Sequence, residues 1–209
     1  MNRRATLRAL VASIGVLPLS AFAADDEARA VTAPIRAFYA ALLDVMRRAK
    51  ALGIQGRYDA LAPVIRATFD LAAMTRISVG PRWNSIQPEQ QTALIDGFTR
   101  MTTATYANRF DGYSGERFVV DPAVETRKTG SVVHTQLVQS TGTPISLNYL
   151  MRKSAAGWKV VDVYLAGAIS ELATRRSEFG AILDSGGPTK LIDTLKQQTD
   201  KLLHPAPAS

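Results

Sequence analysis

The chain has 209 residues, of which 46% are apolar, 21% are charged and none is cysteine, and its formal net charge is +7. This apolar fraction is typical of a folded globular protein and excludes a disordered or collagen-like chain. The absence of cysteine excludes disulfides, thiolate nucleophiles and cysteine-ligated zinc. Because the only histidines are His134 and His204, we predict neither a metal site nor a cofactor.

The first 23 residues have the features of a secretory signal peptide. Three arginines without an acid precede an apolar run over residues 9–19, which ends in the small-x-small sequence AFA at residues 21–23. The run is too short for a transmembrane helix, which needs about 20 residues. We therefore expect cleavage after Ala23 and export of a soluble mature protein. Loss of the three arginines lowers the net charge from +7 to +4, which weakens the case for a nucleic-acid partner.

Apolar residues recur with a helical period in the first half of the mature chain. The predicted helices cover residues 31–49, 59–67, 71–78 and 88–110. We expect Thr32 to cap the first of these helices, and Gly53 and Gly56 to end it. Asp70 is a suitable cap for the third helix, and Pro88 suits the first turn of the fourth.

The hydrophobic period changes to two after residue 116, which predicts strands. The predicted strands are residues 117–120, 124–128, 132–139, 145–152 and 158–165, and two closing helices follow over residues 169–184 and 188–203. Short links between the strands imply an antiparallel meander with one face to bury. The predicted fold class is α+β, with N-terminal helices, a curved antiparallel sheet of four to five strands and C-terminal helices that fold back. We expect one domain over residues 24–203 with a helical lobe, and a flexible tail over residues 204–209.

The sequence contains no phosphate-binding loop, nucleophile elbow or zinc-protease motif. His134 lies in a predicted strand with no acid or nucleophile near it in the sequence, and is interpreted as an outward-facing or hydrogen-bonded strand residue. Strand parity places Asp162 on an exposed face, together with Trp158 and Tyr164. Two alternatives stay open: a small cone-shaped α+β enzyme that uses Asp162 or His134 as a base on an apolar substrate, and an interaction module with a closed core.

Several segments resemble the MlaC family, also called the toluene-tolerance family. They are residues 69–80 (FDLAAMTRISVG), Trp83, residues 88–90 (PEQ), 98–107, 144–149, 157–163 (GWKVVDV) and 167–170 (GAIS). The match covers nearly all of the mature chain in the expected order. Two further segments, residues 110–116 and 169–179, resemble the hopanoid-associated branch called HpnM.

The resemblance implies a periplasmic lipid carrier that belongs to an ABC transport system and is not an enzyme. Its implied partners are a phospholipid or hopanoid-type lipid, an inner-membrane ABC transporter complex and an outer-membrane lipoprotein complex, with transient membrane contact only and no nucleic acid. The acyl tails would lie in an apolar cavity between the sheet and the helices, and the headgroup would face solvent.

Strand and helix parity predict which side chains would contact the tails. These lipid-binding candidates are Phe38, Leu42, Met74, Phe98, Met101, Leu137, Ile145, Leu147, Tyr149, Val161 and Val163. Methionine and phenylalanine suit a site for variable chains. Since arginine binds phosphate well, Arg82, Arg109 and Arg152 are candidates for the headgroup or the cavity rim.

Overall fold

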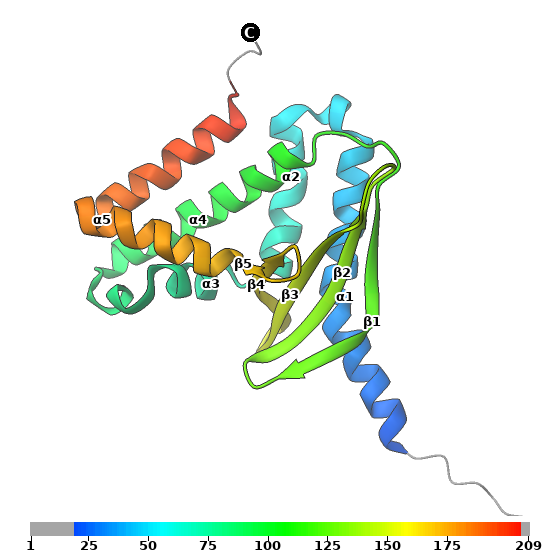
Figure 1. Cartoon of the computed structure of the whole chain (residues 1–209). Helices are drawn as coiled ribbons and strands as arrows, with labels where there is room; N and C mark the ends of the chain where they lie inside the picture. The colour runs from blue at the N-terminus through cyan, green and yellow to red at the C-terminus, as the bar shows by residue number, and fades with distance from the viewer. Residues whose placement is uncertain (1–18, 206–209) are drawn as a thin grey trace, which may run out of the picture.

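Figure 1 shows the computed structural model, which describes the backbone of residues 19–205 and the side chains of residues 25–205. The elements in chain order are α1 (Leu19–Arg47), α2 (Ala49–Thr68), α3 (Leu71–Val79), a 3-10 helix η1 (Gly80–Ser85), α4 (Pro88–Arg109), β1 (Arg117–Arg127), β2 (Gly130–Val138), β3 (Ile145–Ser154), β4 (Gly157–Leu165), β5 (Ile169–Ser170) and α5 (Glu171–Leu203). The predicted α+β class is confirmed. Most of the predicted signal peptide, residues 1–18, and residues 206–209 of the predicted tail lie outside the described residues. Among the helices of the described part, none is both long and apolar enough to cross a membrane.

The first helix is longer than predicted, because α1 begins well before residue 31. Thr32 lies inside α1, where its hydroxyl donates to the carbonyl of Ala28 at 3.0 Å and does not cap a helix start. Inside a helix, a threonine hydroxyl can bond to the carbonyl one turn back. Because α1 ends at Arg47, neither Gly53 nor Gly56 ends the first helix as predicted. Gly53, with φ 61° and ψ −177°, kinks α2, and Gly56 lies within the helix that continues after this kink.

The start and end of α3 agree with the prediction. Asp70 is the N-cap, and its carboxylate accepts a hydrogen bond from the backbone nitrogen of Ala73 at 3.0 Å. Gly80, at φ 71°, ends the helix in a conformation that glycine adopts without strain. Pro88 is the first residue of α4, as its missing N–H predicts.

The sheet is antiparallel throughout, in the order β1-β2-β3-β4-β5. Its first strand, β1, joins the two strands predicted over residues 117–120 and 124–128, with an irregular register between Val120 and Val124. Pro122, which lacks an N–H, is accommodated there because β1 is an edge strand.

A bulge in β4 changes which side chains face the helices. Leu150 pairs with Asp162 while Met151 pairs with Val160, so Val161 is the extra residue. Val160 consequently joins the main core, and Val161 packs with Leu150 on a separate apolar cluster. The parity prediction for Val161 is therefore wrong. The prediction that Asp162 is exposed is also wrong, because only 7% of this residue is accessible.

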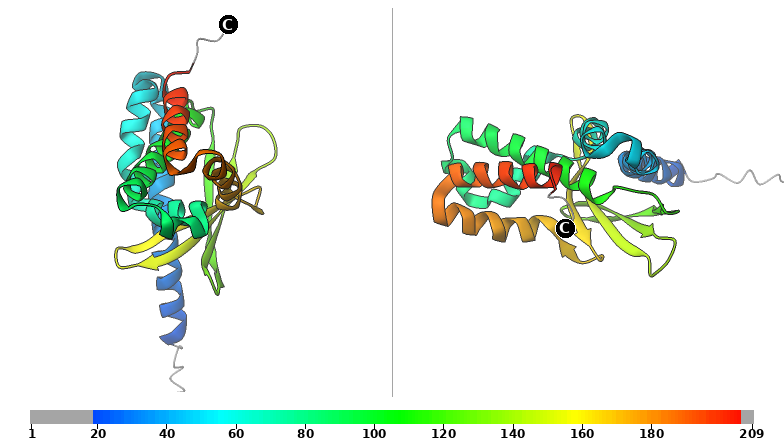
Figure 2. Two further views of the ribbon diagram at one scale, coloured as in Figure 1. Left: turned by 90° about the vertical axis from the view of Figure 1, so that its left-hand side faces the viewer. Right: turned by 90° about the horizontal axis from the view of Figure 1, so that it is seen from above.

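The two predicted closing helices form the two arms of α5, which meet at a kink where Gly187 has φ 68° and ψ −168°. The helix begins at residue 171, because residues 169 and 170 pair with β4 as β5. Figure 2 shows that α1 and α2 lie along one side of the curved sheet, whereas α3, α4 and α5 form a helical lobe beside it. Buried residues from both parts form one main hydrophobic core.

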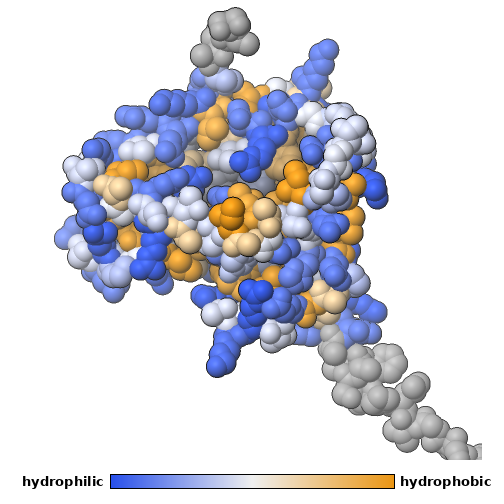
Figure 3. All heavy atoms as spheres, in the orientation of Figure 1, coloured by the Kyte–Doolittle hydropathy of each residue, from blue (hydrophilic) through white to orange (hydrophobic). Residues whose placement is uncertain are grey.

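Most of the surface visible in Figure 3 is hydrophilic. Hydrophobic residues gather near the centre of this face, where Figure 1 places β5. Ile169 of β5 is 59% exposed. A single exposed isoleucine is ordinary for a folded protein and indicates no site by itself.

Candidate functional site

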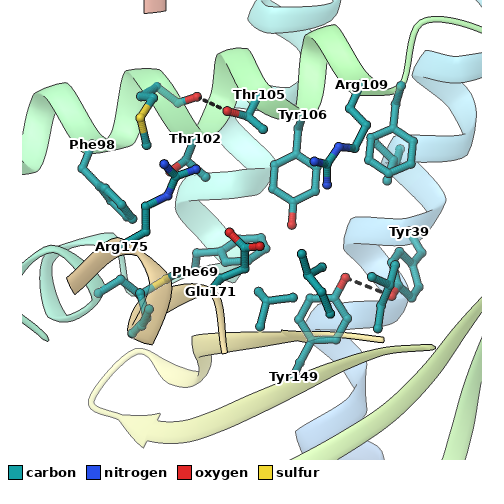
Figure 4. A pocket seen from close by; sticks show the side chains of 18 of the residues that line it. Tyr39, Phe69, Phe98, Thr102, Thr105, Tyr106, Arg109, Tyr149, Glu171 and Arg175 are labelled. Carbon is teal, nitrogen blue, oxygen red and sulfur yellow. Dashed lines mark hydrogen bonds between the residues drawn. The ribbon is translucent and has the colours of Figure 1, made fainter. Parts of the chain in front are cut away.

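A pocket of about 110 Å³ lies between the inner face of the sheet and the helices (Figure 4). Its lining residues are Tyr39, Leu42, Phe69, Met74, Phe98, Met101, Thr102, Thr105, Tyr106, Arg109, Phe110, Phe118, Leu147, Tyr149, Val163, Leu165, Glu171, Leu172 and Arg175. Most of them are apolar or aromatic, and only three are charged. Such a lining is typical of a site for an apolar ligand with a polar group at one end.

One face of α4 supplies the largest share of the lining. Its residues follow the spacing of a single helix face: Phe98, Met101, Thr102, Thr105, Tyr106 and Arg109. On the opposite wall, the register of the sheet pairs Leu147 with Leu165 and Tyr149 with Val163. These pairs point to the same face of the sheet, because alternate residues of a strand share a face.

Seven of the eleven predicted lipid-binding residues line this pocket: Leu42, Met74, Phe98, Met101, Leu147, Tyr149 and Val163. Of the other four, Phe38 and Leu137 are buried in the core without reaching the pocket. Ile145, at the start of β3, is 41% exposed. Val161 lies on the far face of the sheet because of the bulge in β4.

The three predicted rim arginines lie in three different places. Arg109 lines the pocket. Arg82 forms an ion pair with Asp184 on the surface of the helical lobe. Arg152 donates to the carbonyl of Thr129 at 2.9 Å, beside the turn between β1 and β2. Only Arg109 is therefore placed to contact a ligand in this pocket.

The sequence prediction did not include many lining residues. They are Tyr39, Phe69, Thr102, Thr105, Tyr106, Phe110, Phe118, Leu165, Glu171, Leu172 and Arg175. The helical spacing from Phe98 could have identified those on α4. Nothing local in the sequence indicates that Tyr39 or Glu171 reaches the same cavity, because tertiary packing alone brings α1 and α5 to it.

Three tyrosines form the polar part of the pocket near the sheet. The hydroxyl of Tyr39 lies 2.9 Å from that of Tyr149 and 2.6 Å from the Thr135 hydroxyl. Burial raises the pKa of Tyr39 from 10.0 to about 12, and it also raises the pKa values of Tyr106 and Tyr149. All three phenols are consequently neutral at physiological pH, so this part of the pocket is polar but uncharged.

The charged residues of the pocket come from the end of α4 and the start of α5. Figure 4 shows the Tyr106 hydroxyl between Arg109 and Glu171, and the Arg175 side chain on the other side of Glu171, beside Thr102. Glu171 and Arg175 are partly buried, whereas Arg109 is exposed and marks the side of the pocket nearest to solvent. Arg175 donates to the carboxylate of Glu178 at 2.9 Å.

Neither residue of the enzyme alternative lines the pocket. The carboxylate of Asp162 accepts hydrogen bonds from the backbone nitrogens of Val163 and Leu172 and from the Ser170 hydroxyl, at 2.8, 3.2 and 2.6 Å. His134 lies 3.1 Å from Glu125 on β1 and is partly exposed. Within residues 19–205, no cluster of three or more histidine, aspartate and glutamate side chains could hold a metal ion.

The chain resembles known proteins in both sequence and fold. A family model described as MlaC protein matches residues 36–197. Among solved structures, the phospholipid-binding protein from Ralstonia solanacearum, determined in complex with a phospholipid, is 23% identical to this chain. The match covers 83% of this chain and 99% of that protein, with a TM-score of 0.73. No curated protein matches the sequence.

Proposed function

Because the family model matches residues 36–197, which is more than half of the sequence, the chain belongs to the MlaC family, and we propose that it is a lipid carrier. The observation that carries this proposal is the apolar pocket between the sheet and the helices, with charged residues at one end only. The complex of the Ralstonia solanacearum protein with a phospholipid supports it, since the two chains share a fold.

Such a carrier needs no reactive group. Removing one CH₂ group from water stabilises a lipid by about 0.8 kcal/mol. Two acyl chains of roughly 15 methylenes each would therefore cost about 24 kcal/mol if they were exposed to water. A lipid therefore crosses water very slowly unless a protein covers its tails. The walls formed by Leu42, Met74, Leu147 and Val163 would provide this cover.

The pocket must expand to hold acyl tails. Its volume of about 110 Å³ is below the roughly 150 Å³ of a cavity that accommodates one benzene molecule. A groove between α4 and the two arms of α5 shares Met101, Thr105 and Arg175 with the pocket. Movement of these three side chains would join the two spaces, and methionine changes its shape at low cost.

The proposed setting is the periplasm, after cleavage at Ala23. There the carrier would move lipid between an inner-membrane ABC transporter complex and an outer-membrane lipoprotein complex. A hopanoid-type lipid is the second candidate cargo, because residues 110–116 and 169–179 resemble the HpnM branch. Fractionation of cells that express the full chain tests the location, and a protein retained in the cytoplasm would contradict it.

The test of lipid binding is extraction of the purified protein with organic solvent, followed by mass spectrometry. We expect one phospholipid or hopanoid-type molecule per chain. Leu147→Trp would fill the pocket and reduce the bound lipid, whereas Val119→Trp, at a residue that is 43% exposed on β1, would not. A protein that carries no lipid and takes none from vesicles would overturn the proposal.

A further inference from the structure

A second hollow, an open cleft of about 750 Å³, shares Phe69 with the pocket as a wall residue. The end of α2, the start of α3, the middle of α4 and the β3–β4 hairpin surround this cleft. Its lining differs in chemistry from that of the pocket, because half of its ten lining residues are charged. Burying acyl tails against so many charges would be costly, so the cleft suits a polar partner.

The helix α4 presents opposite faces to the two spaces. Asp96, Thr99 and Arg100 line the cleft, at the spacing of one helix face. Phe98, which lines the pocket, is two positions from both Asp96 and Arg100. Since two positions turn a helix by about 200°, a molecule in the cleft would lie on the other side of α4 from the pocket.

The cleft is lined by three cations without a carboxylate partner in the part of the chain that the structure describes: Arg66, Arg100 and Lys159. The ammonium of Lys159 is fixed, because it donates to the carbonyls of Arg66 and Ala67 at 3.0 and 2.6 Å. Arg66 and Arg100 are exposed. Their guanidinium groups are therefore accessible to carboxylates, which they can bind in a bidentate manner.

The row of cations continues onto the sheet. Arg152 of β3 is the cross-strand partner of Lys159, and its guanidinium donates to the carbonyl of Thr129, in the turn that also contains Lys128. Neither Arg152 nor Lys128 takes part in an ion pair within residues 25–205. Like charges in one row repel each other, so an anionic partner along the row would relieve the repulsion. We call this row the basic stripe; its members are Lys128, Arg152, Lys159, Arg66 and Arg100.

Two carboxylates lie in the cleft beside the basic stripe. Asp70 is engaged as the N-cap of α3, where it accepts from the backbone nitrogen of Ala73. Asp96 is exposed and lies one turn before Arg100 on α4. Five cations and two acids leave a local charge of +3, against +4 expected for the whole mature chain. Most of the excess positive charge is therefore concentrated on this side of the molecule.

We infer that the basic stripe is a docking site for an extended acidic segment of a partner protein. Such a segment can enter the concave middle of the stripe between α3 and α4, whereas a flat bilayer surface would reach only its exposed ends. The inference goes beyond the proposed function and does not depend on it, because the stripe and the pocket lie on different sides of α4. For a lipid carrier, this separation would let a partner stay bound while lipid enters or leaves the pocket.

The test measures binding of an acidic peptide to the purified protein. Fluorescence anisotropy would follow a fluorescein-labelled peptide of alternating glutamate and glycine. We expect binding that weakens as the salt concentration rises to about 0.15 M, because exposed charges are screened. The double variant Arg66→Gln with Arg100→Gln should bind the peptide about tenfold more weakly, which corresponds to about 1.4 kcal/mol. A peptide of alternating glutamine and glycine should not bind.

Matched variants separate the stripe from net charge. Lys50→Gln with Arg117→Gln removes the same charge at exposed positions of α2 and β1, and should change the affinity by less than about twofold. Equal losses in the two double variants would overturn the inference, since net charge alone would then explain the binding.

An acid gives a second comparison of opposite sign. Asp96→Asn should strengthen peptide binding by about threefold, because it removes a repulsive charge from the cleft. Asp111→Asn, at an exposed position after α4, should leave the affinity unchanged. Equal effects of these two substitutions would contradict the inference.

The wild-type protein tests the inference even where a variant does not fold, since a lack of peptide binding by the wild type would overturn it. Flotation with phosphatidylglycerol vesicles tests a bilayer as the partner. Vesicle binding that requires Arg66 and Arg100, without peptide binding, would overturn the inference in favour of a membrane.

Lipid extraction keeps the inference separate from the proposed function. The Arg66→Gln and Arg100→Gln double variant should carry as much lipid as the wild type. Loss of lipid from this variant at an unchanged melting temperature would place the stripe in the lipid site and overturn the docking role. A wild-type protein that binds the peptide but no lipid would overturn the proposed function alone.

Discussion

The hydroxyl of Tyr39 on α1 donates to the hydroxyl of Tyr149 on β3 at 2.9 Å, although the two residues are 110 positions apart in the sequence. This contact joins the first helix to the middle of the sheet at the pocket wall. Thr135 of β2, 2.6 Å from the Tyr39 hydroxyl, extends the network to a third element. A buried network of this kind stabilises the fold only while every phenol keeps its proton.

Stability is expected to fall at high pH because of this network. Burial raises the pKa of Tyr39 from 10.0 to about 12. The unfolded chain releases the proton first, so the stabilisation is complete below about pH 10 and is lost as the pH rises to about 12. The difference between the pKa of Tyr39 in the unfolded and the folded chain corresponds to about 3 kcal/mol in the free energy of unfolding.

Urea unfolding between about pH 9 and pH 11.5 measures this loss. The wild-type midpoint should fall more steeply than that of Tyr39→Phe, which lacks the titrating group, whereas lysine deprotonation affects both proteins alike. If the urea midpoints of the two proteins fell in parallel as the pH rises, Tyr39 would not contribute to the loss of stability at high pH.

Replacement of Asp162 should destabilise the fold and leave lipid binding intact. Asp162→Ala removes the acceptor of two backbone N–H groups, those of Val163 and Leu172, and of the Ser170 hydroxyl. We expect a loss of about 3 kcal/mol in the free energy of unfolding, because buried donors are left without partners. Asp193→Ala, at an exposed position of α5, is the control and should cost less than about 0.5 kcal/mol.

Chemical denaturation and lipid extraction together test this assignment. If folded Asp162→Ala bound no lipid, Asp162 would have a direct role in the site, which its position outside the pocket lining does not predict.

Two glycines with positive φ are expected to respond differently to alanine. A Cβ at Gly130, which has φ 145°, would clash with the backbone carbonyl oxygen of Met151 in the neighbouring strand. Gly142 has φ 97° but open space around it. We expect Gly130→Ala to cost more than about 3 kcal/mol and Gly142→Ala about 1 kcal/mol, since only the first adds a steric clash to the backbone strain.

Thermal melts of both variants give the comparison. Equal shifts in melting temperature would mean that the sheet adjusts around residue 130 and that backbone strain alone determines the cost.

Arg57 is expected to be essential for the packing of α2. Its side chain is buried, with 8% of the residue accessible, and it donates to the carbonyls of Ala107 at 2.8 Å and Ala49 at 3.1 Å. Arg57→Met should lower the free energy of unfolding by about 2 to 4 kcal/mol, because two buried acceptors lose a charged donor. Arg57→Lys should recover only part of the lost stability, since a compact ammonium group cannot reach both carbonyls as the planar guanidinium does.

The matched variant Arg66→Met, at an exposed position of the same helix, should change stability by less than about 0.5 kcal/mol. Guanidinium unfolding curves measure all three proteins. A similar loss for Arg66→Met would indicate that helix propensity, and not the buried hydrogen bonds, sets the effect.

Local signals predicted most of the elements. Asp70 and Gly80 mark the ends of α3 because a cap and a left-handed residue act on their own neighbours along the chain. Parity along β3 likewise identified Leu147 and Tyr149 as residues of one face. The alternation of inward and outward residues gave the wrong face for Val161, because the bulge at this residue depends on how β4 pairs with β3.

Composition, periodicity and motifs were enough to establish the fold class, the family resemblance and the absence of a thiol or a cysteine-ligated metal site. Which residues share the pocket depends instead on how distant segments pack together. Tyr39, Arg109 and Glu171 come from three helices that are distant in the sequence, and packing of those helices against the sheet brings them together. The buried state of Asp162 and the charged end of the pocket follow from that packing, which no local pattern encodes.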